Sequence, residues 1–495
     1  MDATTGAGTA AIGPGAGHPT AGHGLTPAHG PAEQAYNNPA EPAHGPGPGR
    51  TAPAPATDGR GVAHAPGADP AMDGRGTPGL VGGPGTAEAG EPAGGHGVAA
   101  GPGGPDAVGP GQAAHGHGVA HGRGPAAGRR GASPATGLWG RFEQQDFRSR
   151  VRGTLLGSAI GDAFGASVGA RTLDAIRAVH GPHGLTTPPA TPLTAATQLT
   201  PFTVDGLIRA HVRRDTGTWH PPTDIHRAYL RWAATQHDWG PDERREDNGW
   251  LARQEWLYAR RGPDRACLTG FADDILGTPA QPKNPTARNA AAATRSAPFG
   301  LLVGWEPALV LQLAVECAAQ SHGHPAAYLS AGAFALVVHG LTRGESPDSA
   351  VQRALGQLGS RPGHQPVTDA LQRALAAVTQ GAPDPATVET LAAGDAEAAL
   401  AVAVYCALVA EDVPHGLRLA VNHGGDSAAA GALCGALFGA LHGETALPAA
   451  WLAELDGRAI VLELADDFAL EMTQGPALHG PAGASPGWLA RYPRG

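Results

Sequence analysis

The segment best suited to chemistry is residues 421–427, which read Val-Asn-His-Gly-Gly-Asp-Ser. This polar cluster interrupts two stretches that consist mostly of Ala and Leu. Its adjacent glycines let the backbone approach a ligand closely. The helix expected from about Ser427 offers free N–H groups to an anion or to Asp426. Asp426 fits equally well as an ordinary N-cap, so the segment predicts either a ligand-binding loop or a helix cap.

Two further polar segments leave the same kind of choice open. Arg295 precedes an apolar helix, where it could hold a phosphate or carboxylate, or form a buried ion pair. Residues 321–325 read Ser-His-Gly-His-Pro, which places two histidines two positions apart in a turn. His322 and His324 could bind a metal ion or satisfy the C-terminus of a helix that ends at Gln320.

Helices must position these segments, because apolar residues recur at helical spacing through the second part of the chain. In residues 146–169 they repeat at steps of three to five, and strand-like alternation is nearly absent. Gly, Pro and His mark the breaks. The pattern predicts one all-α domain over residues 136–480. Further helices are expected over residues 203–213, 224–236, 307–320, 328–341, 347–358, 367–379, 396–410, 414–421, 428–441 and 448–474.

The first 135 residues have a different composition. The 495-residue chain holds 75 Gly and 46 Pro, and many of them lie in this stretch, whose one aromatic residue is Tyr36. Such a segment buries too little apolar surface to offset the entropy of ordering its backbone. We expect a disordered tail over residues 1–135, whose histidines, including His115 and His117, follow no fixed ligand spacing. Residues 481–495 are expected to form a flexible C-terminal tail.

The net charge of −10, without a basic patch, argues against nucleic acid as a partner. No apolar run reaches roughly 18 residues, so no membrane span is expected. The N-terminus lacks the basic start and apolar run of a signal peptide. The cysteines are expected to be buried free thiols of a cytoplasmic protein, and they are Cys267, Cys317, Cys406 and Cys434.

Taken together, these segments resemble the ADP-ribosylglycohydrolase family, in particular its dinitrogenase-reductase-activating type. Residues 249–263 also resemble actinobacterial members. The resemblance runs from about Val151 to Asp467. It is carried by residues 152–157, 161–165, 194–200, 295–301, 321–325, 405–408, 422–427 and 464–467.

The resemblance implies an all-α bundle whose central cleft holds a pair of Mg²⁺ or Mn²⁺ ions. Active members hydrolyse the bond between ADP-ribose and a protein side chain or another leaving group. Hard cations prefer several oxygen ligands, mainly carboxylates. The family supplies these ligands from a Thr-Asp-Asp motif and an Asp-Ser-Asp-Ser motif.

This chain departs from both motifs. The first reads Thr194-Ala195-Ala196, and the second reads Asp426-Ser427-Ala428-Ala429. Of the six ligand positions, Thr194 and Asp426 remain, which is too few to offset the dehydration of two divalent ions. A Glu that some members use as a proton acceptor corresponds to Gly169. We therefore expect no metal cofactor and no catalytic residue.

The expected ligand loop is altered as well. Where family members often have a Gly-Cys-Gly-Gly-like run, residues 289–293 read Asn-Ala-Ala-Ala-Ala, and Ala does not easily adopt positive φ. The remaining residues that could contact ADP-ribose, in a functional or vestigial cleft, are Asn422, His423, Gly424, Gly425 and Arg295.

Three hypotheses follow. The first is a metal-free pseudoenzyme that binds ADP-ribose or an ADP-ribosylated protein without cleaving it. The second is an interaction scaffold with no small-molecule ligand. The third is an active Mg²⁺-dependent hydrolase that recruits other carboxylates, such as Asp162, Asp205 and Glu397. The third requires three or more carboxylates within about 5 Å of Asp426.

Overall fold

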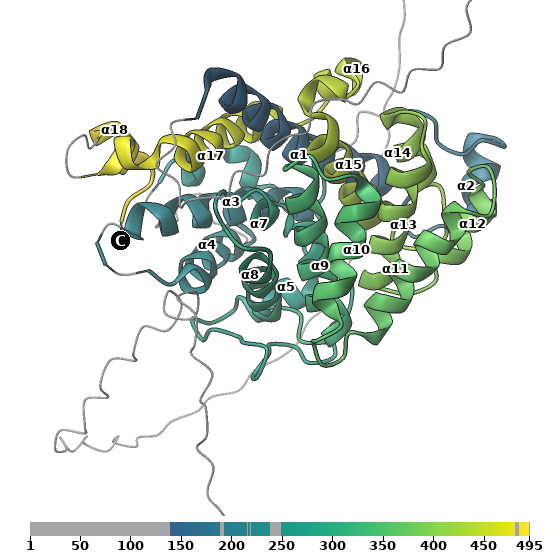
Figure 1. Cartoon of the computed structure of the whole chain (residues 1–495), viewed down its shortest axis with the longest axis horizontal. Helices are drawn as coiled ribbons and strands as arrows, with labels where there is room; N and C mark the ends of the chain where they lie inside the picture. Colours follow the sequence, from purple (N-terminus) through teal and green to yellow (C-terminus); the bar gives the residue numbers. More distant parts are fainter. Residues whose placement is uncertain are drawn as a thin grey trace, which may run out of the picture. The chain divides into compact units, whose positions relative to one another are not determined.

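A computed structural model describes residues 139–188, 193–214, 216–217, 219–237, 249–480 and 485–494. Within these residues the regular elements are all helices, which confirms the all-α expectation (Figure 1). The tail predicted for residues 1–135 lies outside the described residues. No helix in the described part of the chain is long and apolar enough to cross a membrane.

Most of the helices are separated by short connections along the chain. The long or well-formed ones are α1 (Arg141–Val168), α2 (Leu173–His180), α3 (Ala195–Arg214), α4 (Pro221–Thr235), α8 (Pro307–Ala319), α9 (Pro325–Leu341), α10 (Pro347–Leu358), α11 (Gln365–Val378), α13 (Ala396–Val409), α14 (Val413–Val421), α15 (Ser427–His442) and α17 (Arg458–His479). The short ones are α5 (Arg265–Gly270), α6 (Ala291–Thr294), α7 (Ala297–Gly300), α12 (Pro385–Leu391), α16 (Ala449–Ala453), α18 (Pro486–Arg491) and the 3-10 turns η2 (Leu251–Arg253), η3 (Glu255–Tyr258) and η4 (Glu444–Ala446).

Proline and capping side chains explain where many helices begin. Pro stands in the first turn of α8, α9 and α10, where its missing N–H has no helical partner to lose. Ser346 caps α10 by accepting from the Ser349 amide, and Asp412 caps α14 by accepting from the His415 amide. These local interactions fix where the four helices begin.

Helices α1 and α15 pack with backbone against backbone. A Cβ on Gly161 would lie 1.8 Å from the carbonyl oxygen of Gly431, and a Cβ on Gly157 would lie 2.1 Å from that of Gly435. Gly153 and Gly439 repeat the contact four residues further along. This spacing of four residues lines the glycines along one face of each helix, so only residues without a side chain permit this approach.

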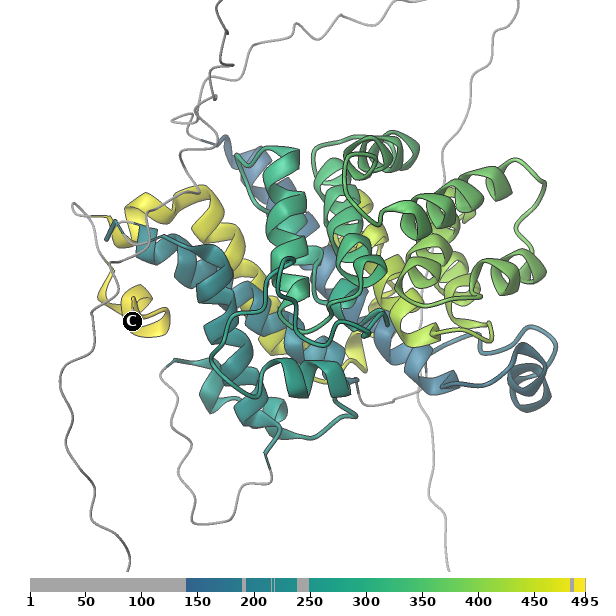
Figure 2. The same ribbon diagram turned by 90° about the horizontal axis from the view of Figure 1, so that it is seen from below.

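The core is formed by helices that are apolar on nearly every face. Almost every residue of α9 and α13 is buried, and α9 packs against α8, α10, α13 and α15. A helix that is apolar all round belongs in the interior, whereas amphipathic helices such as α10 and α11 cover the outside. In both views α17 lies alongside α3 (Figures 1 and 2).

Two sequence-based expectations are wrong at the C-terminal end. The helix expected over residues 448–474 is divided into α16 and α17 by Gly457, whose φ of +71° is left-handed. Residues 485–494, expected to be part of a flexible tail, instead contain α18. Trp488 and Tyr492 are buried four residues apart on its inner face, and the Tyr492 hydroxyl donates to Asp467 at 2.6 Å. Residues 481–484 and 495 lie outside the described residues.

Candidate functional site

The loop that joins α14 to α15 carries four of the residues predicted to contact a ligand. Asn422 follows the last residue of α14, and Asp426 is the N-cap of α15. The Asp426 carboxylate accepts from the backbone N–H of Ala429 at 3.0 Å. The capping interpretation of Asp426 therefore describes its local structure, while one side of the residue stays exposed to solvent.

Asn422 and His423 are buried and hold the loop from inside. The Asn422 amide donates to the carbonyls of Leu185 and Arg418 and accepts from the N–H of Leu185 at 2.8 Å. His423 Nε2 lies 2.9 Å from the Ala420 carbonyl, and Nδ1 accepts from the N–H of Gly425. Burial lowers the pKa of His423, which keeps its ring neutral. The side-chain amide of Asn422 and both ring nitrogens of His423 therefore already have hydrogen-bond partners within the protein.

The glycine pair has partners for its amides too. The N–H of Gly424 donates to the carboxylate of Glu389 at 2.8 Å, and the N–H of Gly425 donates to His423 at 3.0 Å. Glu389 belongs to α12 and is 35 residues away in sequence. A negative side chain thus occupies a backbone donor that an anionic ligand would use.

Thr194 stands just before α3 and faces the buried carboxylate of Asp162 on α1. Its hydroxyl lies 2.8 Å from Asp162 Oδ1, and its N–H donates to Oδ2 at 3.0 Å. The Thr197 hydroxyl also donates to Oδ2, at 2.5 Å. Ala195 and Ala196, at the two lost carboxylate positions, form the first residues of α3. Gly169, at the position of the lost proton acceptor, ends α1.

Two other carboxylates act electrostatically on the carboxylate of Asp426. Burial raises the pKa of Asp426, and the charges of Asp264 and Asp395 raise it further. Burial likewise raises the pKa of Asp162, with Asp426 adding a smaller repulsion. Asp426 nevertheless belongs to no group of three His, Cys, Asp or Glu ligand atoms within 4.8 Å of one another among the described residues.

The other carboxylates considered from sequence are already paired. Asp205 is fully buried in α3, with Arg209 at 2.9 Å and Arg231 as a second partner. Glu397, in the first turn of α13, pairs with Arg288 at 2.7 Å. Neither is free to approach Asp426 without leaving its arginine.

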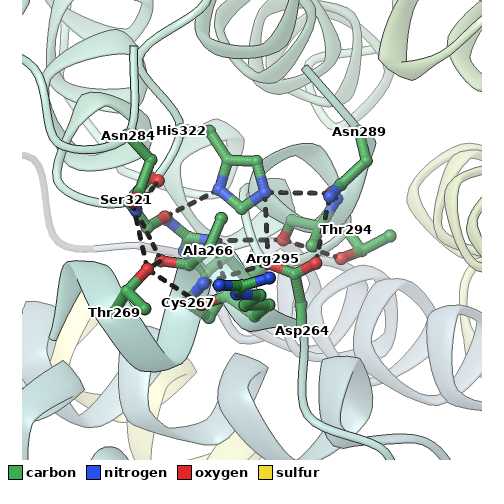
Figure 3. Close-up of polar contacts among 12 residues, drawn as sticks. Asp264, Ala266, Cys267, Thr269, Asn284, Asn289, Thr294, Arg295, Ser321 and His322 are labelled. Atoms are coloured by element: carbon green, nitrogen blue, oxygen red, sulfur yellow. Dashed lines mark hydrogen bonds and ion pairs between the residues drawn. The ribbon is translucent and has the colours of Figure 1, made fainter. Parts of the chain in front are cut away.

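Arg295 is 1% exposed and lies at the centre of a polar network (Figure 3). Its guanidinium donates to the Ser321 hydroxyl at 2.6 Å and to the carbonyls of Ala291 and Cys317. The rings of Tyr229 and Phe271 lie 4.9 and 5.5 Å from its central carbon. These contacts replace the phosphate or carboxylate partner that was considered from sequence.

His322 continues this network toward Asp264 (Figure 3). The Ser321 hydroxyl lies 2.9 Å from His322 Nδ1, and Nε2 lies 2.9 Å from Asn289 Oδ1 and 3.4 Å from Asp264 Oδ1. Burial lowers the pKa of His322, so the ring is neutral. Because Ser321 accepts from Arg295, its own proton points to Nδ1, and Nε2 carries the ring proton. His324 instead caps α9 by accepting from the Ala326 amide.

Sequence reasoning did not identify three residues that contact the predicted ones, namely Asp264, Asn289 and Glu389. Asp264 caps α5 by accepting from the Cys267 amide at 3.0 Å, and its other oxygen accepts from Asn289 at 3.0 Å. Burial raises the pKa of Asp264, but the bonds from His322, Cys267 and Asn289 outweigh burial and hold it below its ordinary value. An acidic residue three positions before the Cys267 amide is a recognisable N-cap signal. Its approach to His322 depends on the tertiary fold.

The alanine run before Arg295 is helical. Residues 291–294 form α6, Ala292 and Ala293 are fully buried, and the Asn289 side chain, before the helix, accepts from the Ala291 amide. A cavity of about 610 Å³ lies between the end of α4 and α5, and Phe271, whose ring contacts Arg295, is among its lining residues. None of the residues that line it belongs to the set predicted from sequence. All four cysteines are buried free thiols, as expected.

Comparisons with known proteins give one family match and a similar solved structure. The model of the ADP-ribosylglycohydrolase family matches residues 143–477. A solved structure named "ADP-ribosylglycohydrolase-related protein complex" aligns with a TM-score of 0.47 and 24% sequence identity, covering 67% of this chain and 100% of that chain. The comparison with curated proteins gives no match.

Proposed function

Because the chain belongs to the ADP-ribosylglycohydrolase family, we propose that it is a metal-free member that binds ADP-ribose or an ADP-ribosylated protein without cleaving it. The observation that carries this proposal is the side-chain set at the positions where the family resemblance implies a metal pair. Of those six positions, one carboxylate, Asp426, and one Thr hydroxyl remain.

The residues present do not fit two divalent ions. The Thr194 hydroxyl is directed to Asp162, which also accepts from Thr197 and from the Thr194 N–H. Asp426 contributes one capping carboxylate. Mg²⁺ and Mn²⁺ need several oxygen ligands each, and no further carboxylate of the described residues joins Asp426 in a three-ligand group.

The residues at the position of the proton acceptor and the remaining carboxylates also support a loss of hydrolysis. Gly169 stands where a proton acceptor is implied by the resemblance, and Gly has none. Asp205 and Glu397, which a rebuilt site would have to recruit, are held by arginines. Without a positioned base or a polarising cation, the site lacks the groups that would activate water to attack a glycosidic bond.

A second candidate, an interaction scaffold without a small-molecule ligand, is favoured by one specific observation. The amides of Gly424 and Gly425 already have protein acceptors, and the acceptor of Gly424 is a carboxylate. An anionic ligand would have to displace Glu389 and tolerate Asp426 nearby. This candidate predicts a protein partner for the surface of the helical domain or for residues 1–135.

The remaining expectations extend the proposal. We propose that residues 136–480 form the family domain, that residues 1–135 form a disordered extension, and that the protein is cytoplasmic. Assignment to the dinitrogenase-reductase-activating type or to an actinobacterial group rests on the resemblance alone.

Calorimetry of the full-length protein with ADP-ribose, once with EDTA and once with Mg²⁺, tests the proposal. Binding that is unchanged by Mg²⁺ supports a metal-free reader of ADP-ribose. Binding that requires Mg²⁺ contradicts the proposal. The absence of binding in both conditions rejects the reader and favours the scaffold.

A further inference from the structure

Three side chains with metal-binding atoms converge beside Arg295. The ligand atoms of Asp264, Cys267 and His322 all lie within 4.8 Å of one another (Figure 3). Asp264 caps α5, Cys267 lies within α5, and His322 lies in the turn between α8 and α9. We propose that these three residues form a binding site for a divalent cation of the zinc type, which would tie α5 to the α8–α9 turn.

The spacing fits such a cation better than it fits Mg²⁺. Zinc–nitrogen and zinc–oxygen bonds of about 2.0 Å in a tetrahedron place the two ligand atoms roughly 3.3 Å apart. The observed separation of His322 Nε2 and Asp264 Oδ1 is 3.4 Å. A thiol, an imidazole and a carboxylate are zinc ligands, whereas Mg²⁺ prefers oxygen alone. Asn289 Oδ1, 2.9 Å from His322 Nε2, offers a fourth ligand at the same place.

The surrounding bonds already orient the ligands. Ser321 Oγ, 2.9 Å from His322 Nδ1, fixes the ring so that Nε2 faces Asp264 and Cys267. Ligating histidines commonly have such a partner on the other ring nitrogen. Asp264 is held by the Cys267 amide and the Asn289 side chain. Its side chain is 27% exposed, which provides a route for a cation to the otherwise buried cluster.

Binding of the cation displaces one proton and moves another. The cation replaces the proton of the Cys267 thiol, which leaves to solvent, and the His322 proton moves from Nε2 to Nδ1, so the ring stays neutral. The Ser321 oxygen then accepts from Nδ1 as well as from Arg295. Arg295 Nη1, 3.6 Å from Cys267 Sγ, favours the thiolate but repels the cation. This repulsion lowers the affinity below that of an all-neutral surrounding.

Cobalt(II) is the most selective probe for this site. The chain contains 23 His, and several lie in residues 1–135, so metal stoichiometry alone does not identify a site. A thiolate bound to Co²⁺ gives a charge-transfer absorption that histidine ligation does not produce. We expect the full-length reduced protein to show this absorption with Co²⁺, and Zn²⁺ to abolish it by displacement.

Two variants test whether Cys267 is the thiolate that produces the absorption. Cys267→Ser is expected to remove it, and Cys434→Ser, which changes a buried thiol outside the cluster, is expected to retain it. Circular dichroism checks that both variants fold. If Cys267→Ser does not fold, Asp264→Asn preserves the N-cap, because Asn caps as well as Asp. It is expected to weaken Co²⁺ binding by at least about tenfold through the lost charge.

Three results would overturn the site. The first is the absence of a thiolate absorption in the wild-type protein, the second is its persistence in the Cys267→Ser variant, and the third is unchanged Co²⁺ affinity in Asp264→Asn. None of these results depends on ADP-ribose or Mg²⁺, so the zinc-type site and the proposed function can fail separately.

Discussion

The hydroxyl of Thr194, a partly buried residue just before α3, lies 2.8 Å from Oδ1 of Asp162 on α1. Burial raises the pKa of Asp162, while bonds from Thr194 and Thr197 favour its charged form. This carboxylate is therefore used to hold the start of α3 against α1. The same bond turns the Thr194 hydroxyl away from a role as a ligand for an added cation.

Restoring the family ligands should create a cation site. The change is Ala195→Asp, Ala196→Asp, Ala428→Asp and Ala429→Ser in one chain, which surrounds Asp426 with added oxygen ligands. We expect Mg²⁺ or Mn²⁺ binding by calorimetry in this variant alone, because carboxylates offset the dehydration of hard cations. The matched control carries Asn in place of the three added Asp. If the restored protein still ignores both ions, the two motifs have been assigned to the wrong positions.

Removing the negative charge of Glu389 should favour an anionic ligand near the Gly424 amide. We expect Glu389→Gln to bind ADP-ribose more tightly than the wild-type protein, because the amide side chain no longer repels the pyrophosphate. Glu454→Gln, at an exposed position in the turn after α16, serves as the control. Calorimetry in EDTA measures both. Equal affinities in all three proteins would show that Glu389 does not compete with this ligand.

The contact between α1 and α15 should tolerate no side chain. Gly161→Ala places a Cβ 1.8 Å from the Gly431 oxygen, so the helices must separate. We expect the free energy of unfolding to fall by about 1–3 kcal/mol or more. Gly356→Ala, on the exposed face of α10 with nothing within 4 Å, should instead raise it by about 0.5–1 kcal/mol. Urea unfolding compares the two, and equal effects would contradict the backbone packing.

His339 should make stability depend on pH. Burial, with Arg343 adding repulsion, lowers the pKa of His339 to about 3. Above the unfolded pKa of about 6.5 neither state is protonated, and below it the unfolded state alone gains the proton. Stability is therefore lost as pH falls from about 6.5 toward 3. Between about pH 7.5 and 5.5 this group should cost about 1.4 kcal/mol.

The variant His339→Gln isolates this contribution, since other buried histidines titrate in both proteins. Urea unfolding at the two pH values should show a smaller loss of stability in the variant than in the wild-type protein. The same loss in both proteins would mean that His339 is protonated in the folded state.

The sequence was sufficient for features that depend on nearby residues. Helical spacing predicted helices such as α8 and α10, and Asp426 was recognised as a candidate N-cap. Features made by distant residues were missed. The Glu389–Gly424 bond spans 35 residues and the Asn289–His322 bond spans 33, and neither has a local signal. The break at Gly457 was also missed, because a single Gly is tolerated in many helices.

Arg295 illustrates why residue type alone left the site open. A lone arginine before an apolar helix suits a phosphate and a buried structural role equally well. Its buried structural role follows from the Ser321 hydroxyl, two carbonyls and two aromatic rings, which tertiary packing brings together around the guanidinium.

The most direct test of the central claim is release of ADP-ribose from ADP-ribosylated protein, measured for the full-length chain with Mg²⁺, with Mn²⁺ and with EDTA. An active family member serves as the positive control. The lost carboxylates predict no release above the uncatalysed rate under any of the three conditions. Release that requires Mg²⁺ or Mn²⁺ and disappears with EDTA would contradict the claim that this chain is a non-hydrolysing member of its family without the Mg²⁺ or Mn²⁺ pair.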